Sequence, residues 1–189
     1  MSGTMATRHL LFIQGGGRGA HAADAELAKS LQQALGDGFE VHFPVMRDEG
    51  APSFALWKEQ IAAELSQLRG AVTLVGHSLG GAMLLSYLAE QTPPTHIPAL
   101  VLLAAPAWDG ERWAFDELVL PGDLADKLDA IPLLLLYHCH DDETVPFAHL
   151  ARHAAKLPQA ITVAMTRGGH QFGNDLQAVA ADLRAALAG

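Results

Sequence analysis

GHSLGG, residues 76–81, joins two apolar segments of different character. The segment before it, residues 71–75 (AVTLV), is short and rich in β-branched side chains, which predicts a buried strand. The segment after it, residues 82–90 (AMLLSYLAE), lacks glycine and proline and predicts a buried helix. The sequence therefore predicts a tight turn from strand to helix with Ser78 at its apex.

The glycines around Ser78 have a steric purpose. Only small residues at positions 76 and 80, two before and two after the serine, let the strand and the helix pass so closely. Such a turn strains the serine backbone, raises its hydroxyl above the sheet and directs free helix N–H groups at whatever the serine attacks. The pattern matches G-x-S-x-G, the turn that presents a nucleophilic serine. Because short motifs also occur by chance, this interpretation requires an acid and a histidine that follow in the expected order.

Composition limits the class of protein. The chain has 189 residues, half of them apolar and 17% charged, as expected for one folded domain over residues 1–189. No apolar run approaches the roughly 18–20 residues that cross a bilayer, and no secretory leader is recognisable. A single cysteine, Cys139, excludes an internal disulfide, so we expect a cytoplasmic protein. The net charge of −9 argues against nucleic acid and membrane surfaces as partners, because both select clustered lysine and arginine.

Segments with strand and helix patterns alternate along the chain. This alternation predicts an α/β fold with three layers, in which a parallel sheet of about six strands lies between helices. The predicted strands span 8–14, 39–45, 71–75, 99–104, 131–138 and 161–166, and the predicted helices span 21–35, 53–68, 82–90, 147–157 and 172–187.

An acid and a histidine follow Ser78 on the loops after the last two predicted strands. Asp141 and Asp142 come after the strand that ends near residue 138, and His170 comes after the final strand. In parallel sheets, functional groups gather on the loops at the carboxyl ends of the strands. The order of serine, aspartate and histidine is the order found in α/β-hydrolases.

Three motifs in this order resemble those of the α/β-hydrolase superfamily, and the resemblance covers nearly the whole chain. Residues 76–81 resemble the nucleophile motif, and Gly169-His170 resembles the G-H loop. Residues 142–146 (DETVP) resemble the D-x-x-V-P acid loop, which selects Asp142 over Asp141. The resemblance implies that His170 accepts the proton of Ser78 while Asp142 orients the imidazole. We expect neither a cofactor nor a metal ion.

QGGG, residues 14–17, follows the first predicted strand and occupies the place of the HGGG loop of lipases and esterases. Glutamine replaces the usual histidine, which can alter the support of the loop but leaves its backbone donors intact. We expect the oxyanion hole to consist of the Leu79 N–H and the Gly16 N–H, with Gly17 as the alternative to Gly16.

Two other interpretations compete with the hydrolase. Gly15, Gly17 and Ala20 also fit the dinucleotide pattern G-x-G-x-x-G/A, which needs an acid at the end of the next strand, whereas Glu40 begins that strand. His138, His140 and Asp142 allow a metal site, but no established metal motif accompanies them. Cys139 lies between these histidines and is expected on the opposite face, in the core.

A lid-like segment of residues 107–130 follows the fourth predicted strand. Its aromatic residues Trp108, Trp113 and Phe115 either form an apolar substrate pocket or pack over the edge of the sheet. So short a segment favours small esters over a deep lipase tunnel. The sequence predicts a serine hydrolase that cleaves small carboxylic esters or thioesters through an acyl-enzyme. The alternative is a protein-binding module on a hydrolase scaffold, and the oligomeric state is left open.

Overall fold

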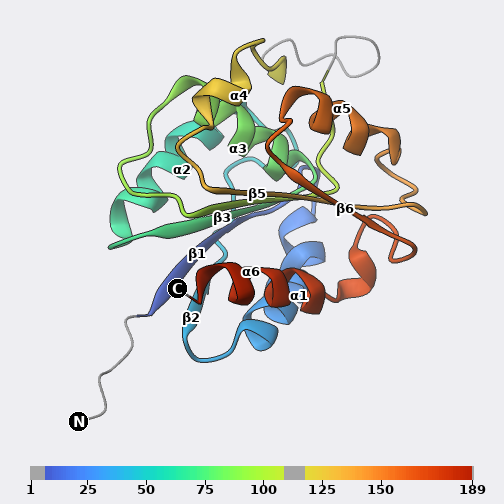
Figure 1. Ribbon diagram of the computed structural model, residues 1–189, viewed down its shortest axis with the longest axis horizontal. Coiled ribbons are helices and arrows are strands. Elements are labelled where there is room, and N and C mark those ends of the chain that lie inside the picture. Colours follow the sequence, from blue (N-terminus) through green and yellow to red (C-terminus); the bar gives the residue numbers. More distant parts are fainter. Residues whose placement is uncertain (1–6, 109–117, 189) are drawn as a thin grey trace.

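The computed structural model describes residues 7–108 and 118–188, which form a parallel six-stranded sheet between two layers of helices (Figure 1). This confirms the predicted α/β class and the number of strands. The strands are β1 (Arg8–Ile13), β2 (Phe39–His42), β3 (Val72–His77), β4 (Ala99–Leu103), β5 (Leu133–Cys139) and β6 (Ile161–Met165). The helices are α1 (Ala20–Leu35), α2 (Phe54–Gln67), α3 (Leu79–Glu90), α4 (Leu124–Lys127), α5 (Ala148–Lys156) and α6 (Gln177–Leu187), with a short 3₁₀ turn, η2 (Phe172–Asn174), before α6.

The strand order is β2-β1-β3-β4-β5-β6, and every neighbouring pair is parallel. After β1 the chain moves outward to β2 and then crosses back to β3 on the other side of β1. The loops that leave β1 and β3 therefore diverge, and they open a crevice at the carboxyl ends of these strands. Ile13 at the end of β1 is in register with Gly76 of β3, so the glycine loop lies beside the turn at Ser78.

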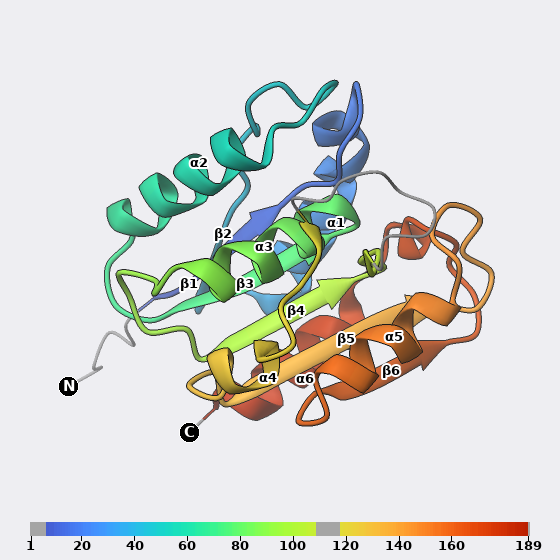
Figure 2. The same cartoon turned by 90° about the horizontal axis from the view of Figure 1, so that it is seen from above.

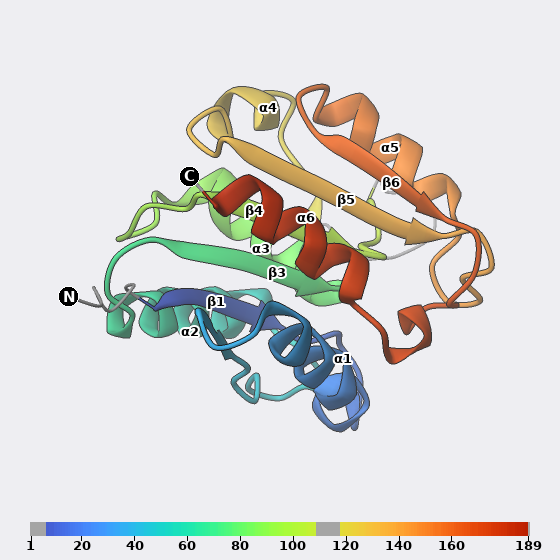
Figure 3. The same ribbon diagram turned by 60° about the horizontal axis from the view of Figure 1, so that its bottom comes forward.

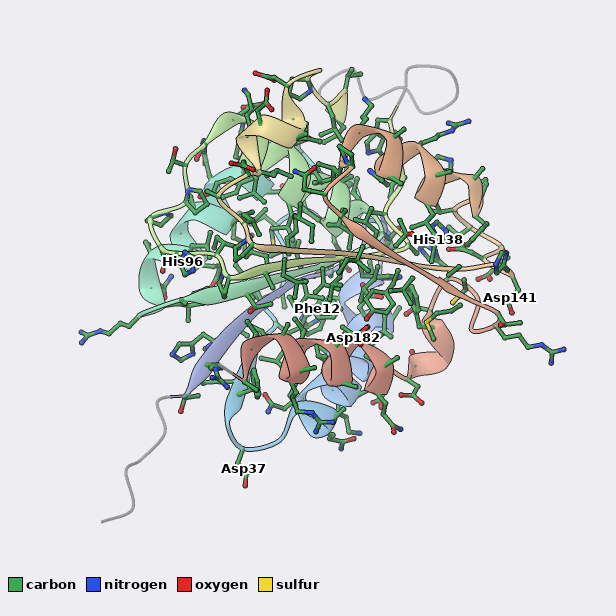
Figure 4. The ribbon with its side chains drawn as sticks, viewed as in Figure 1. Phe12, Asp37, His96, His138, Asp141 and Asp182 are labelled. Atoms are coloured by element: carbon green, nitrogen blue, oxygen red, sulfur yellow. The ribbon has the colours of Figure 1, made fainter. Side chains whose placement is uncertain are left out.

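Helices cover both faces of the sheet. Figure 2 looks onto the face covered by α2 to α5, and Figure 3 brings α1 and α6 on the other face forward. Side chains alternate between two cores: Leu11 and Ile13 of β1 pack toward α2 and α3, whereas Leu10 and Phe12 pack toward α1 and α6. Figure 4 shows Phe12 between the sheet and α6. Burial on both faces explains why the central strands are continuously apolar.

The last helix begins later than the apolar spacing predicts. Residues 172–174 form the 3₁₀ turn, and Phe172, Gly173 and Asn174 have φ values of 51°, 60° and 55°, which no α-helix permits. Phe172 and Leu176 are nevertheless buried. In this segment the apolar spacing therefore reflects which side chains are buried and does not indicate a helix.

Residues 118–130, which belong to the lid-like segment of residues 107–130, pack into the core on the α3 face. They include the short helix α4, which the sequence analysis did not predict. Their buried side chains are Leu118, Leu120, Leu124 and Leu128.

No helix in the described part of the chain combines the length and the apolar character that a membrane crossing requires.

Candidate active site

Ser78 lies at the junction of β3 and α3 in a strained backbone conformation. Its φ of 52° and ψ of −125° are values that a residue with a side chain rarely adopts. Its N–H donates a hydrogen bond to the Leu103 carbonyl of the neighbouring strand β4 at 2.8 Å, which ties the turn to the sheet. The side chain is partly exposed at the carboxyl edge of the sheet.

Close packing around the turn explains its glycines. A methyl group at Gly80 would lie 2.3 Å from the backbone oxygens of Ile13 and Gln14, and one at Gly76 would lie 2.6 Å from the Cα of Gly81. These distances are far inside van der Waals contact, and the obstructing atoms belong to the backbone. The glycines therefore bring α3 directly against the end of β1.

Asp142 and His170 form a hydrogen-bonded pair at the ends of β5 and β6. The Nδ1 of His170 lies 2.9 Å from Oδ2 and 3.1 Å from Oδ1 of Asp142. The Asp142 side chain is fully buried, and its Oδ1 also accepts the N–H groups of Thr144 and Val145 at 2.8 Å. Burial alone would raise the pKa of Asp142, but hydrogen bonds from His138, His170 and these N–H groups lower it overall. An ionised Asp142 accepts the Nδ1–H of His170 and leaves Nε2 available as a base.

The neighbouring acids hold the histidine loop in place. Asp141 accepts the N–H groups of Gly168 and Gly169 at 3.3 and 2.9 Å, and Glu143 accepts the N–H of His170 at 3.2 Å. Figure 4 shows Asp141 at the carboxyl ends of the strands, far from His96 at the opposite end. Asp142 is thus the acid that contacts the imidazole, whereas Asp141 contacts the backbone of the loop.

Ser78 and His170 line the same cavity, whose volume is about 240 Å³. The structure brings the glycine loop to this cavity as well: a methyl group at Gly16 would lie 2.2 Å from the Cδ2 of Leu79. The cavity is lined by residues 15–20, Ala23, Asp24, His77, Ser78, Thr144, His170 and Gln171.

Backbone hydrogen bonds distinguish the three glycines of the loop. The N–H of Gly15 donates to Asp24 at 2.8 Å, and the N–H of Gly17 donates to the Glu49 carbonyl at 2.7 Å. Within residues 7–108 and 118–188, the N–H groups of Gly16 and Leu79 have no protein acceptor. These two N–H groups are therefore free to bind an oxygen of a substrate.

Gln14 supports the loop from beneath. It is completely buried, its Nε2 donates to a Glu49 carboxylate oxygen at 2.8 Å, and its Oε1 accepts the N–H of Met46 at 3.1 Å. The Glu49 carboxylate also accepts the N–H groups of Gly19 and His21 at 2.7 and 2.9 Å. The amide of Gln14 thus connects β1, the glycine loop and the segment after β2.

A second buried pair of an acid and a histidine forms part of the wall of the cavity. The Nδ1 of His77 is 2.8 Å from Oδ2 of Asp24, and its Nε2 is 2.9 Å from the backbone oxygen of His170. Burial alone would raise the pKa of Asp24, but hydrogen bonds from His77, Gly15 and Gln171 lower it overall. Both ring nitrogens of His77 thus face oxygen atoms of other segments. Asp24 and His77 therefore connect the glycine loop, the Ser78 turn and the histidine loop.

Sequence reasoning missed this pair, and it also missed the contact of His138 with Asp142, whose Nε2 and Oδ2 lie 3.1 Å apart. Asp24 offered one signal: it is a charged residue on the face of α1 that buries Leu27 and Leu31. His77 precedes the serine directly, but its partners lie 53 and 93 positions away in the sequence.

The structure separates several other residues from the site. Trp108 is buried in the α3-side core and is not among the residues that line the cavity beside Ser78. Trp113 and Phe115 lie outside the described residues. The ring of His140 stacks on Phe147, which also contacts the ring of His138 edge-on, and His138 donates to the Val145 carbonyl. Cys139 is buried in the opposite core.

Known proteins share both the sequence family and the fold. The family model described as serine hydrolase matches residues 28–175. No curated protein matches the sequence significantly. The ydeN gene product of B. subtilis is 20% identical with a TM-score of 0.75, over 97% of this chain and 100% of that one. Est1E from Butyrivibrio proteoclasticus is 17% identical with a TM-score of 0.70, over 98% and 90% of the two chains.

A third structure, the esterase domain of a Rhodothermus marinus protein, is 20% identical with a TM-score of 0.65, over 98% of this chain and 87% of that one. At such low identities these structures establish the fold alone, whereas the family model establishes the family. The parallel sheet and the strained serine at the end of β3 are those of the α/β-hydrolase fold. Because the family model covers most of its length, the chain belongs to the serine hydrolase family.

Proposed function

We propose that this protein hydrolyses small carboxylic esters or thioesters through an acyl-enzyme on Ser78. One observation carries the proposal: the strained Ser78 shares a small cavity with His170, whose Nδ1 lies 2.9 Å from a buried aspartate. A serine hydroxyl is a weak nucleophile until a base removes its proton. The cavity supplies a histidine for that purpose, and the histidine has an acid behind it.

In the proposed reaction, Nε2 of His170 takes the Ser78 proton while Oγ attacks the ester carbonyl. Asp142 holds the ring in the tautomer with Nδ1–H and stabilises the imidazolium that forms. The free N–H groups of Gly16 and Leu79 stabilise the oxyanion of the tetrahedral intermediate. The imidazolium then protonates the departing alcohol or thiol. A water molecule, activated by the same histidine, hydrolyses the acyl-enzyme and restores Ser78.

The size of the cavity supports short acyl groups. Its volume of about 240 Å³ lies below the range of roughly 300–1,000 Å³ that is typical of sites for drug-sized ligands. Glycine and alanine account for much of its wall, so a longer acyl chain would find little apolar surface to cover it. We therefore propose acyl chains of a few carbon atoms as the preferred substrates.

Steady-state hydrolysis of a series of p-nitrophenyl esters and matched thioesters, from two to twelve acyl carbons, tests this function. We expect kcat/KM to be highest for short chains and to fall by at least about a thousand-fold in Ser78→Ala and His170→Ala. Ser66→Ala, on the exposed surface of α2, is the matched control and should keep full activity. Equal activity of Ser78→Ala and the wild type would refute the proposal.

A further inference from the structure

Two histidines and a glutamate converge on the edge of the sheet, away from the active site. His9 belongs to β1, and Glu40 and His42 belong to β2. The Nδ1 of His9 lies 3.0 Å from Nε2 of His42 and 3.4 Å from Oε2 of Glu40, and the last two atoms are 3.8 Å apart. Three potential metal ligands thus form one small triangle.

Strand pairing fixes this triangle. His9 is directly in register with Glu40 in the parallel pair of β1 and β2, and His42 follows Glu40 by two residues. Side chains two positions apart in a strand point to the same face. The three side chains therefore project from one face of a hydrogen-bonded strand pair, a scaffold that holds their spacing without help from a loop.

The three distances scatter around those between ligands of a tetrahedral metal ion. Zinc bonds imidazole nitrogen and carboxylate oxygen at about 2.0–2.2 Å, so neighbouring ligands of a tetrahedral site lie about 3.3–3.6 Å apart. The three observed separations of 3.0, 3.4 and 3.8 Å fall around these values. We propose that His9, Glu40 and His42 bind a divalent transition-metal ion, zinc above all.

The donor set agrees with zinc. Two imidazoles and one carboxylate with an open fourth position are a known ligand set of this ion. The Glu40 side chain is 56% exposed, so water can reach the fourth position. The guanidinium of Arg8, the residue next to His9, lies over the ring of Phe39, whose side chain packs in the opposite core. Arg8 therefore does not occupy the triangle as a rival cation.

The site would stabilise the edge strand and not take part in ester hydrolysis. β2 is an edge strand and pairs only with β1, so an ion shared by both strands would cross-link them. His9 precedes Gln14, at the start of the glycine loop, by five residues, about 16 Å along an extended strand. A hydrogen-bonded cluster without metal is the competing explanation, because one N–H of His9 can be shared between Nε2 of His42 and Oε2 of Glu40.

Isothermal titration of the full-length, metal-stripped protein with Zn²⁺, together with thermal unfolding with and without Zn²⁺, separates the two explanations. We expect one saturable site per chain and an unfolding midpoint that rises by several degrees with Zn²⁺. His42→Ala and Glu40→Gln should lower the affinity on the order of 100-fold and abolish the thermal shift. The conservative Glu40→Gln removes the charge while it keeps the size of the side chain.

His96→Ala removes an exposed histidine outside the triangle and is the matched control, which should bind Zn²⁺ as the wild type does. Circular dichroism and metal-free unfolding show whether each variant is folded. Unchanged affinity in folded Glu40→Gln and His42→Ala, or no saturable binding by the wild type, would overturn the proposal. Loss of binding in His170→Ala but not in His42→Ala would also overturn it, since the ion would then occupy the active site.

Discussion

At the scale of single residues, the site combines strain with a dense set of hydrogen bonds. Ser78 has a positive φ that its side chain disfavours, and the sheet and α3 hold it there. Asp142, Asp24 and Glu49 each accept several hydrogen bonds, and all three have a lowered pKa. These acids keep the acid loop, the serine turn and the glycine loop in fixed positions.

Ser78→Gly should stabilise the protein while it abolishes activity. Glycine adopts a φ of 52° without steric cost, so the strain of roughly 1–3 kcal/mol is relieved and only partly offset by the greater entropy of the unfolded chain. We expect the free energy of unfolding to rise by about 1 kcal/mol in urea titrations. Ser66→Gly, in the helix α2, should instead lose about 0.5–1 kcal/mol. A destabilised Ser78→Gly would show that the turn is not strained.

Asp24→Asn should reduce kcat more than it changes KM. The substitution removes the charge that faces His77 and weakens the acceptor for the Gly15 N–H, so the glycine loop and the histidine loop lose their common anchor. Hydrogen bonds to a buried charged group are worth about 1.5–3 kcal/mol, so thermal unfolding should detect their weakening as well. Asp37→Asn is the control, because Asp37 is exposed and points away from the fold in Figure 4. Wild-type kcat in Asp24→Asn would show that the pair does not position the site.

At the scale of elements, the site depends on how closely α3 approaches the end of β1. Gly76 and Gly80 permit this approach, and the crevice between the loops after β1 and β3 follows from the reversal of the strand order. Ser78, the free N–H groups of Gly16 and Leu79, and His170 come from three different loops at the carboxyl ends of the strands.

Gly80→Ala should therefore disturb both stability and catalysis. The added methyl group would lie 2.3 Å from the backbone oxygens at the end of β1, so α3 must move. Overpacking of this kind costs about 1–3 kcal/mol, and the displacement would separate Leu79 from Gly16. Gly38→Ala is the matched control, because a methyl group there contacts nothing within 4 Å. Equal unfolding midpoints for the two variants would contradict the close approach.

At the scale of the whole molecule, the sequence predicted the architecture well. The six strands, their parallel arrangement and the need for glycine at positions 76 and 80 follow from apolar patterns and sterics, and the structure agrees. The catalytic roles of Ser78, Asp142 and His170 remain predictions, although their side chains all lie at the carboxyl ends of the strands.

What the sequence could not predict depends on contacts between distant segments. The pair of Asp24 and His77 joins residues 53 positions apart, and the triangle of His9, Glu40 and His42 depends on which strand is the neighbour of β1. Neither strand order nor register can be read from a single apolar pattern. Helix α4 was missed because its four residues are too few for a recognisable period.

The free energy of unfolding should decrease as the pH is lowered from about 6.5 to about 4. His153 is buried, and its burial lowers its pKa to about 4, while its Nε2 donates to the Ala105 carbonyl and its Nδ1 has no partner in the described chain. In this window the unfolded chain binds a proton at His153 that the native chain does not, so acid favours unfolding by up to about 1.4 kcal/mol per pH unit.

His153→Gln should flatten this part of the profile in urea titrations at several pH values, because glutamine keeps a donor but does not titrate. His96→Gln, at an exposed position, should leave the profile unchanged. The lowered pKa of Asp142 acts in a separate window below its ordinary value of 3.8, where protonation removes the stability that its hydrogen bonds provide. An unaltered slope in His153→Gln would contradict the assignment to His153.

The central claim, an activated nucleophile at Ser78, is tested most directly by mass spectrometry after incubation with a fluorophosphonate. The account predicts one adduct per chain, located on Ser78, absent in Ser78→Ala and formed much more slowly in His170→Ala. A folded wild-type protein that forms no adduct, or that carries it on another residue, would contradict the account.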